Sequence, residues 1–395
     1  MYSKLSHYFL ASILLISSTG SSASLLLGPD LEGYSVIAGA ALNISANAIV
    51  TDDVAARAAV GIGAQTDTAN IYSGAAVVTG AGGNSGDIYA GAAAGIAALG
   101  SATNIYAEAA VTLGAGGTAG DIYAGAAVTL AAGSSSGDVI AGGAVTGAGF
   151  TNKTASTPNA APAVSSYKAT FDIAKAIQQI ADAQTALSSL EHDFELDVGM
   201  GNFDFEPGIY KGTALTIAAD STIRFDGEGA ENPLWIFNLS SALTAGARNK
   251  FEIINAGAGA SVIWNLGGSL VLGAGNSFIG ATFITGAAAG ATSDVTCGNL
   301  FTTSAIGIGS TISTNCKGSD TWAGSVNGMA DGVDITDGVV TNTSVAKVSV
   351  AKVSVRPQTV TPPLVPVPVP APSTGLLFGI FALLLFAATA KRKCK

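Results

Sequence analysis

The chain contains little charge and almost no histidine. Of its 395 residues only 11% are charged, with 17 Lys and Arg against 27 Asp and Glu, whereas an ordinary soluble protein has about 25%. Cations this sparse argue against nucleic-acid capture, because phosphate binding needs clustered Lys and Arg. The two histidines are His7 and His192, and we expect His7 to be removed with a signal peptide. A His-rich metal site and a Ser-His-Asp triad are therefore nearly excluded.

The N-terminus has the three parts of a secretory signal. Lys4 supplies the positive start, residues 9–16 form a short apolar core, and small residues at 21–23 form a cleavage site. The apolar core is shorter than the roughly 20 residues that span a bilayer. We therefore expect residues 1–23 to direct export and to be removed.

The C-terminus also has three parts. A Pro-rich run at 362–372 precedes sixteen apolar residues at 375–390 and a basic tail at 391–395. One interpretation is a single membrane anchor. The other is a sorting signal that is cut and exchanged for surface attachment, since residues 369–374 (VPAPST) resemble the motif of PEP-CTERM proteins, with Ala371 in place of the usual Glu. Both interpretations place residues 24 to about 360 outside the inner membrane.

The N-terminal third repeats with a period of 17 residues. The segment that begins at Asn70 (NIYSG) recurs from Asp87, Asn104, Asp121 and Asp138, and related copies lie further upstream, to give seven in all. A fixed short period indicates a solenoid. Each unit holds short β-type runs separated by Gly and Ser, and no unit is long enough for a helical repeat. The sequence therefore predicts an all-β fold, a parallel β-helix with coils of roughly 17 residues.

Stacked coils place equivalent side chains in rows about 4.8 Å apart. Residues alternate inward and outward along a strand, so Ile122 and Leu130 are predicted to be internal, and Tyr123 and Thr129 external. The repeated tyrosines should then form a ladder, and we expect a helix to pack over it. The predicted members of this ladder are Tyr72, Tyr89, Tyr106 and Tyr123.

A helix is predicted at 167–190, where apolar residues recur at helical spacing. Its apolar stripe needs a partner, and the solenoid wall is available. The predicted segments are a signal peptide (1–23), regular coils (24–151), a loop plus helix (152–200), C-terminal coils (201–320), a stalk and Pro-rich linker (321–374) and a hydrophobic segment (375–395).

The second half resembles the bacterial and fungal ice-binding protein family, whose fold is an irregular β-solenoid with one helix alongside. The matching pieces are PGIY at 207–210, FDG at 225–227, WIF at 235–237, INAGA at 254–258, VIW at 262–264, residues 273–280 and GNLF at 298–301. The resemblance implies adsorption to ice by a flat, weakly charged face that carries small hydroxyl or methyl groups. Such activity needs no cofactor and no catalytic residue.

The resemblance also implies where that face lies, because the family often has Thr-Ala/Gly-x-Thr/Asn patterns there. Residues 213–216 (TALT) match this pattern. Ordinary β-propensity is the alternative explanation for any single threonine. The candidate ice-binding residues are Thr112, Thr129, Thr146, Thr213, Thr216, Thr282 and Thr285.

Cys297 and Cys316 are 19 residues apart, close to one coil. Neighbouring coils can bring two Cα atoms within the range of a disulfide, and export would favour the bond. Two buried thiols are the alternative. Acidic residues at 193, 195 and 197 beside His192 lack a basic partner in the sequence, and Asp331, Asp334 and Asp337 do not have EF-hand spacing. We predict no metal site.

The first hypothesis is a secreted, surface-attached protein that binds ice. The alternative is a structural or adhesive solenoid of the cell envelope or biofilm matrix without ice activity. A carbohydrate-active β-helix enzyme is the third hypothesis, and the scattered acids and missing histidine disfavour it. A flat threonine-bearing side without charge would favour the first hypothesis over the other two.

Overall fold

The computed structural model describes residues 31, 33–147, 151–156, 172–257, 260–290, 294–309, 311–313, 333–336 and 339–342. The chain divides into two compact units, residues 1–354 and 355–395, and all described residues lie in the first. The predicted signal peptide, the C-terminal segment, Cys316, Cys394, Asp331 and Asp337 lie outside the described residues.

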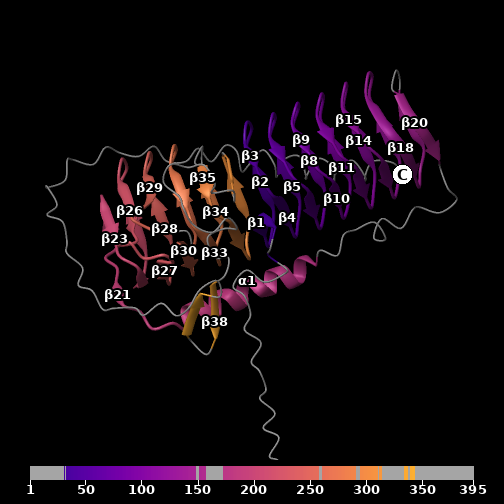
Figure 1. Ribbon diagram of the computed structural model, residues 1–395. Coiled ribbons are helices and arrows are strands. Elements are labelled where there is room, and N and C mark those ends of the chain that lie inside the picture. The colour runs from indigo at the N-terminus through magenta and orange to yellow at the C-terminus, as the bar shows by residue number, and fades with distance from the viewer. Residues whose placement is uncertain are drawn as a thin grey trace, which may run out of the picture. The chain divides into compact units, whose positions relative to one another are not determined.

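The described chain is a parallel β-solenoid whose coils have three sides, which confirms the predicted fold class (Figure 1). We name the sides by what distinguishes them. The helix side comprises β1 (Tyr34–Ala38), β4 (Asp53–Ala56), β7 (Ile71–Ser73), β10 (Ile88–Ala90), β13 (Ile105–Ala107), β16 (Ile122–Ala124), β18 (Ser135–Ala141), β20 (Thr151–Ser156), β21 (Phe194–Glu195), β24 (Gly208–Gly212), β27 (Leu234–Leu239), β30 (Ser261–Leu266), β33 (Ala281–Ile284) and β36 (Leu300–Thr302).

The uncharged side is a 13-stranded sheet. Its strands are β2 (Leu42–Ile44), β5 (Val60–Ile62), β8 (Val77–Thr79), β11 (Ala94–Ile96), β14 (Val111–Leu113), β17 (Val128–Leu130), β19 (Val145–Gly147), β22 (Gly199–Met200), β25 (Leu215–Ile217), β28 (Leu243–Ala245), β31 (Leu270–Leu272), β34 (Ala288–Gly290) and β37 (Ile306–Ile308).

The third side is made of short strands, and β18 also reaches it. Its own strands are β3 (Ile49–Val50), β6 (Asp67–Thr68), β9 (Asn84–Ser85), β12 (Ser101–Ala102), β15 (Thr118–Ala119), β23 (Phe203–Phe205), β26 (Thr222–Asp226), β29 (Lys250–Ile254), β32 (Ser277–Ile279) and β35 (Asp294–Cys297). A separate antiparallel hairpin joins β38 (Val333–Thr336) to β39 (Val339–Asn342).

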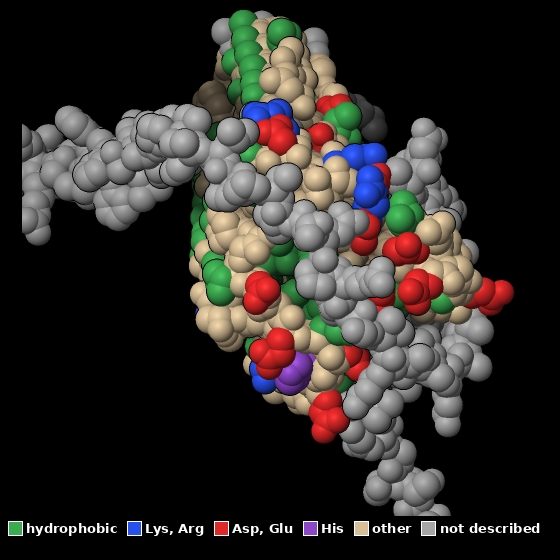
Figure 2. Space-filling view, turned by 90° about the vertical axis from the view of Figure 1, so that its left-hand side faces the viewer, with side chains coloured by type: hydrophobic (Ala, Val, Ile, Leu, Met, Phe, Trp, Pro, Cys, Tyr) green, Lys and Arg blue, Asp and Glu red, His purple; other side chains and the backbone are tan. Residues whose placement is uncertain are grey.

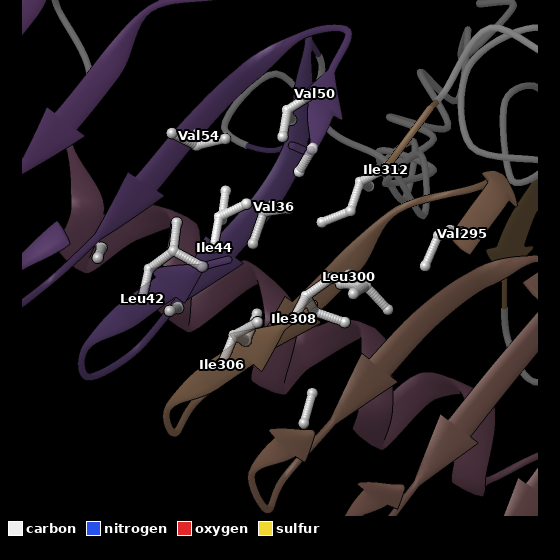
Figure 3. Close-up of a cluster of buried hydrophobic side chains, with 14 of the residues drawn as sticks. Val36, Leu42, Ile44, Val50, Val54, Val295, Leu300, Ile306, Ile308 and Ile312 are labelled. Carbon is white, nitrogen blue, oxygen red and sulfur yellow. The ribbon is translucent and has the colours of Figure 1, made fainter. Parts of the chain in front are cut away.

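The coils do not stack in sequence order. The N-terminal coils run from β1 outward to β20, and the C-terminal coils run from β21 back to β37. The first coil therefore pairs with the last, through β1 with β36 and β2 with β37. Figure 3 shows the apolar core passing through this junction, with Val36 and Leu42 from the first coil close to Leu300 and Ile306 from the last. One continuous core joins the two halves.

The predicted inward and outward pattern is confirmed in the N-terminal coils. Ile122 and Leu130 are fully buried, whereas Thr129 is exposed and Tyr123 is half-buried. The core is built from Ala, Val, Ile and Leu in this half and from large aromatic residues in the C-terminal half. The aromatic core includes Phe205, Phe225, Trp235, Phe237, Trp264 and Phe278. Burial of these apolar side chains stabilises the stack.

One helix, α1 (Ile173–Ser188), packs on the helix side (Figure 1). It begins where the Asp172 carboxylate accepts hydrogen bonds from the backbone N–H groups of Ala174 and Lys175. Its buried face contacts apolar side chains of β1, β4 and the C-terminal coils. The buried helix residues are Ala176, Ile180, Ala183 and Leu187. The predicted helix is confirmed from Ile173, and residues 167–171 lie outside the described residues.

The predicted tyrosine ladder is present, with neighbouring rings from Tyr72 to Tyr123 stacked 4.8–5.1 Å apart. The expected cover by the helix is only partly correct. Tyr72 is buried in the cluster that contains α1 and Tyr89 is partly buried against it, but Tyr106 and Tyr123 are outside that cluster. Burial raises the pKa of the Tyr72 phenol to about 12.

Candidate functional site

The uncharged side presents one outward residue per strand. In the N-terminal half this row continues through Thr112, Thr129 and Thr146, with Val78 and Gly95 at the same position in earlier coils, as the period predicts. In spatial order the complete row is Gly199, Thr216, Thr244, Val271, Ala289, Gly307, Asn43, Gly61, Val78, Gly95, Thr112, Thr129 and Thr146. We call it the outward row.

The outward row is regular over its whole length. Its thirteen strands pair in parallel without a register shift, and the two shifts among the described strand pairs lie in other sheets. Twelve steps of about 4.8 Å give a row of roughly 58 Å. Backbone hydrogen bonds fix this spacing, so the side chains stand at set intervals on a stiff surface.

No member of the outward row is charged, although charged residues lie at a corner that flanks it. At the corner toward the third side, Arg248 makes two contacts of 2.6 Å with the Asp220 carboxylate on the neighbouring coil. The exposed apolar members are Val78, 59% exposed, Val271, 40% exposed, and the smaller Ala289. The surface therefore combines hydroxyl, methyl and glycine positions with the single amide of Asn43.

The third side differs, because an ion-pair ladder crosses its C-terminal half. Arg224 lies 2.8 Å from Glu252 and 3.6 Å from Asp204, and Lys250 lies 2.5 Å from Glu252. Lys250, and then Arg224, hold the pKa of the Glu252 carboxyl below its ordinary value. Figure 2 shows the end of the solenoid near β21 and β23, where Asp and Glu outnumber Lys and Arg. The ion pairs of the third side thus lie outside the outward row.

The structure separates the seven candidate threonines. Thr112, Thr129, Thr146 and Thr216 are exposed members of the outward row. Thr213 is exposed at the corner just before β25.

Two of the candidates lie elsewhere. Thr282 is 0% exposed inside the solenoid, where it pairs with Trp264 and its hydroxyl donates to the Gly280 carbonyl. Naming Thr282 as a surface contact was therefore wrong. Thr285 is exposed but lies beside α1, where its Oγ1 accepts a hydrogen bond from Gln184 Nε2 at 3.1 Å.

Sequence reasoning missed Thr244, which pairs in register with Thr216 in the outward row. The signal was present, because residues 241–244 (SALT) repeat the pattern of residues 213–216 (TALT). The two segments are 28 residues apart rather than 17, so the N-terminal period did not extend to them.

The structure describes Cys297 and His192 but not Cys316. Cys297 is buried and disulfide-bonded, whereas its expected partner, Cys316, lies outside the described residues. His192 is exposed and lies 3.2 Å from Glu195. Among the described residues, no three His, Cys, Asp or Glu side chains come together in an arrangement that would hold a metal ion. No described helix is long and apolar enough to cross a membrane.

Residues 122–314 match the family model described as ice-binding-like. Over 87 residues the chain is 30% identical to ice-binding protein 1 of Shewanella frigidimarina (strain NCIMB 400); this match covers 22% of the chain and spans only 10% of that protein.

Two solved structures are similar at low identity. The ice-binding protein of the Antarctic ascomycete Antarctomyces psychrotrophicus has a TM-score of 0.40 and 14% identity, covering 73% of this chain and 97% of that one. The glycosylated ice-binding protein of an Arctic yeast (LeIBP) has a TM-score of 0.41 and 12% identity, covering 74% and 94%. Residues 122–314 are thus similar to the ice-binding-like family.

Proposed function

We propose that this protein adsorbs to ice through its uncharged side. The observation that carries the proposal is the outward row, in which thirteen in-register parallel strands each present one uncharged residue. The likeness of residues 122–314 to the ice-binding-like family and the names of the similar proteins support it.

The physical argument rests on spacing and hydration. Hydrogen-bonded strands hold the row at a repeat of about 4.8 Å, so water at the surface meets the same pattern at every step. Charged groups would bind water strongly in an arrangement unlike ice, and the row contains none. Thr112, Thr129 and Thr146 at one end, and Thr216 and Thr244 near the other, offer a hydroxyl and a methyl group at each step.

The proposed contact surface includes Thr213 at the adjoining corner. It excludes Thr282, which is buried, and Thr285, which lies beside α1. Adsorption makes and breaks no covalent bond, so the protein acts without catalysis and without a cofactor. Its partner is the ice surface.

Export and attachment follow from the two ends of the sequence. Residues 1–23 direct secretion, and residues 362–395 attach the protein to the cell surface, either as an anchor or as a PEP-CTERM-like signal that is exchanged. A surface-attached protein of this kind would hold a cell to ice or limit the growth of ice around it.

The experiment measures ice recrystallisation and the shape of single ice crystals with the purified full-length chain. The variants are Thr129→Glu and Thr244→Glu, one in each half of the outward row, and Thr118→Glu is the control. Thr118 is also an exposed threonine in a short strand, but it lies on the third side.

Loss of activity in both row variants, with Thr118→Glu unaffected, supports one continuous ice-contact surface. If the unmodified protein leaves crystals unshaped and coarsening unhindered, the proposal is wrong and the structural or adhesive alternative stands. Equal loss of activity in Thr118→Glu would show that the uncharged side is not the contact surface.

A further inference from the structure

A groove runs along the edge of the solenoid, between α1 and the corner that joins the helix side to the uncharged side. Its volume is about 760 Å³, within the range of small-ligand sites in proteins, roughly 300–1,000 Å³. One wall is the helix, with Gln184, Thr185 and Ser188. The other wall is the corner, with Thr213 and Ser240.

The groove has a defined length. Toward one end, which lies at Thr303, Gln184 crosses from the helix, and its Nε2 donates to Thr285 Oγ1 at 3.1 Å and to the Leu266 carbonyl at 3.2 Å. At the other end lie Glu195 and Lys211. The lining runs from β21 to Thr303, just after β36, which is five steps of about 4.8 Å, so the groove is roughly 24 Å long.

The floor of the groove is held in place by the helix. Asn265 Nδ2 donates to Asn238 Oδ1 and to Ser188 Oγ, both at 2.9 Å, and Asn238 Nδ2 donates to the Leu187 carbonyl at 2.8 Å. These bonds fix the side chains that a ligand would meet, so little conformational entropy would be lost on binding.

The chemistry of the lining is neutral and polar. Among the described residues that line it, only Glu195 and Lys211 are charged, and they pair in register on neighbouring strands with opposite sign. Hydroxyl and amide groups dominate the rest, and each can both donate and accept hydrogen bonds. Within the described part of the chain, no protein group hydrogen-bonds to the exposed hydroxyls of Thr213 and Ser240. They remain available to a ligand.

Apolar atoms complete the lining, contributed by Leu190, Leu196 and Leu239. A long, narrow, uncharged groove with paired donor and acceptor groups and a few apolar contacts suits a sugar chain, because sugars present hydroxyl groups at their edges and C–H groups on their faces. A strongly charged ligand would find no excess of opposite charge there. We propose that this groove binds a neutral oligosaccharide, an activity separate from contact with ice.

The test uses isothermal titration calorimetry of the full-length protein with cellohexaose, maltohexaose and mannohexaose as probes. Ser240→Trp fills the groove from its corner wall, and Thr118→Trp places the same side chain on the third side as a control. We expect at least one probe to bind, Ser240→Trp to weaken that binding about tenfold or more, a loss of about 1.4 kcal/mol, and Thr118→Trp to leave it unchanged.

Two further variants keep the result decisive. Gln184→Ala removes the amide that crosses the groove to Thr285 and should weaken binding of the same hexaose, whatever happens to the fold of Ser240→Trp. Thr129→Glu should retain sugar binding while it loses activity on ice, which separates this proposal from the one above. The proposal is overturned if none of the three probes binds, or if a folded Ser240→Trp variant binds as well as the unmodified protein.

Discussion

Gly95→Thr should stabilise the protein and strengthen its contact with ice. Gly95 occupies the outward row between Val78 and Thr112. Its φ lies outside the left-handed region, and an added Cβ would meet no atom within 4 Å. The substitution therefore fits the backbone and extends the run of threonines at 112, 129 and 146 by one step.

The magnitude follows from two contributions. Replacing a glycine at a compatible position restricts the unfolded chain and adds about 0.4–1 kcal/mol to the free energy of unfolding. Pairing across the strands with Val78 and Thr112 adds about 0.2–1 kcal/mol for each neighbour. The total of about 0.8–3 kcal/mol corresponds to a rise in Tm of roughly 2–12 °C for a domain of this size.

The assays are thermal unfolding by circular dichroism and the recrystallisation assay. Gly116→Thr is the contrasting control, because Gly116 has φ +66° and its added Cβ would lie 2.7 Å from Leu99 Cδ2. It should lower the Tm, since the left-handed region is costly for a side chain. A fall in Tm for Gly95→Thr would refute the open geometry of the row. A rise in Tm without a gain in ice activity would refute the role of the outward row in ice binding.

Three other outcomes are expected. Asn265→Leu removes the amide donor that joins the C-terminal half of α1 to β27 and β30. The free energy of unfolding should therefore fall by about 1–3 kcal/mol, and amide hydrogen exchange in α1 should become faster. Unchanged exchange in α1 would show that these hydrogen bonds do not hold the helix. Burial holds the pKa of the Asp53 carboxyl above its ordinary value, so stability falls as pH rises through that pKa. Asp53→Asn should therefore unfold at higher denaturant concentration than the unmodified protein at pH 7, with the gap closing below pH about 4; a constant gap would argue against the shift. Cys297→Ala removes a disulfide and should cost about 2–4 kcal/mol, a loss that dithiothreitol should reproduce in the unmodified protein but not in the variant.

The regular half of the molecule could be predicted from the sequence alone. A period of 17 residues fixes which side chains stack, so the tyrosine ladder and the row through Thr112 and Thr129 follow directly. The in-and-out alternation follows from strand geometry, and the helix follows from its apolar spacing.

The inward or outward orientation of residues in the C-terminal coils could not be predicted in the same way, because the number of residues per coil varies. In the outward row, Thr216 and Thr244 are 28 residues apart, whereas Val271 and Ala289 are 18 apart. Without a constant period, the inward or outward phase of a residue cannot be carried from one coil to the next. This is why Thr282 was placed outside although it lies in the core.

Local sequence thus determined the coil, its core-facing positions and the low charge of its surface, since these depend on neighbours along a strand or one period away. Tertiary structure decided that the last coil returns to pair with the first. That closure depends on an edge-to-edge match between segments more than 260 residues apart, as in the bond from Asn299 Nδ2 to the Tyr34 carbonyl. Because the two halves join in register, threonines from the N-terminal and C-terminal coils share one surface.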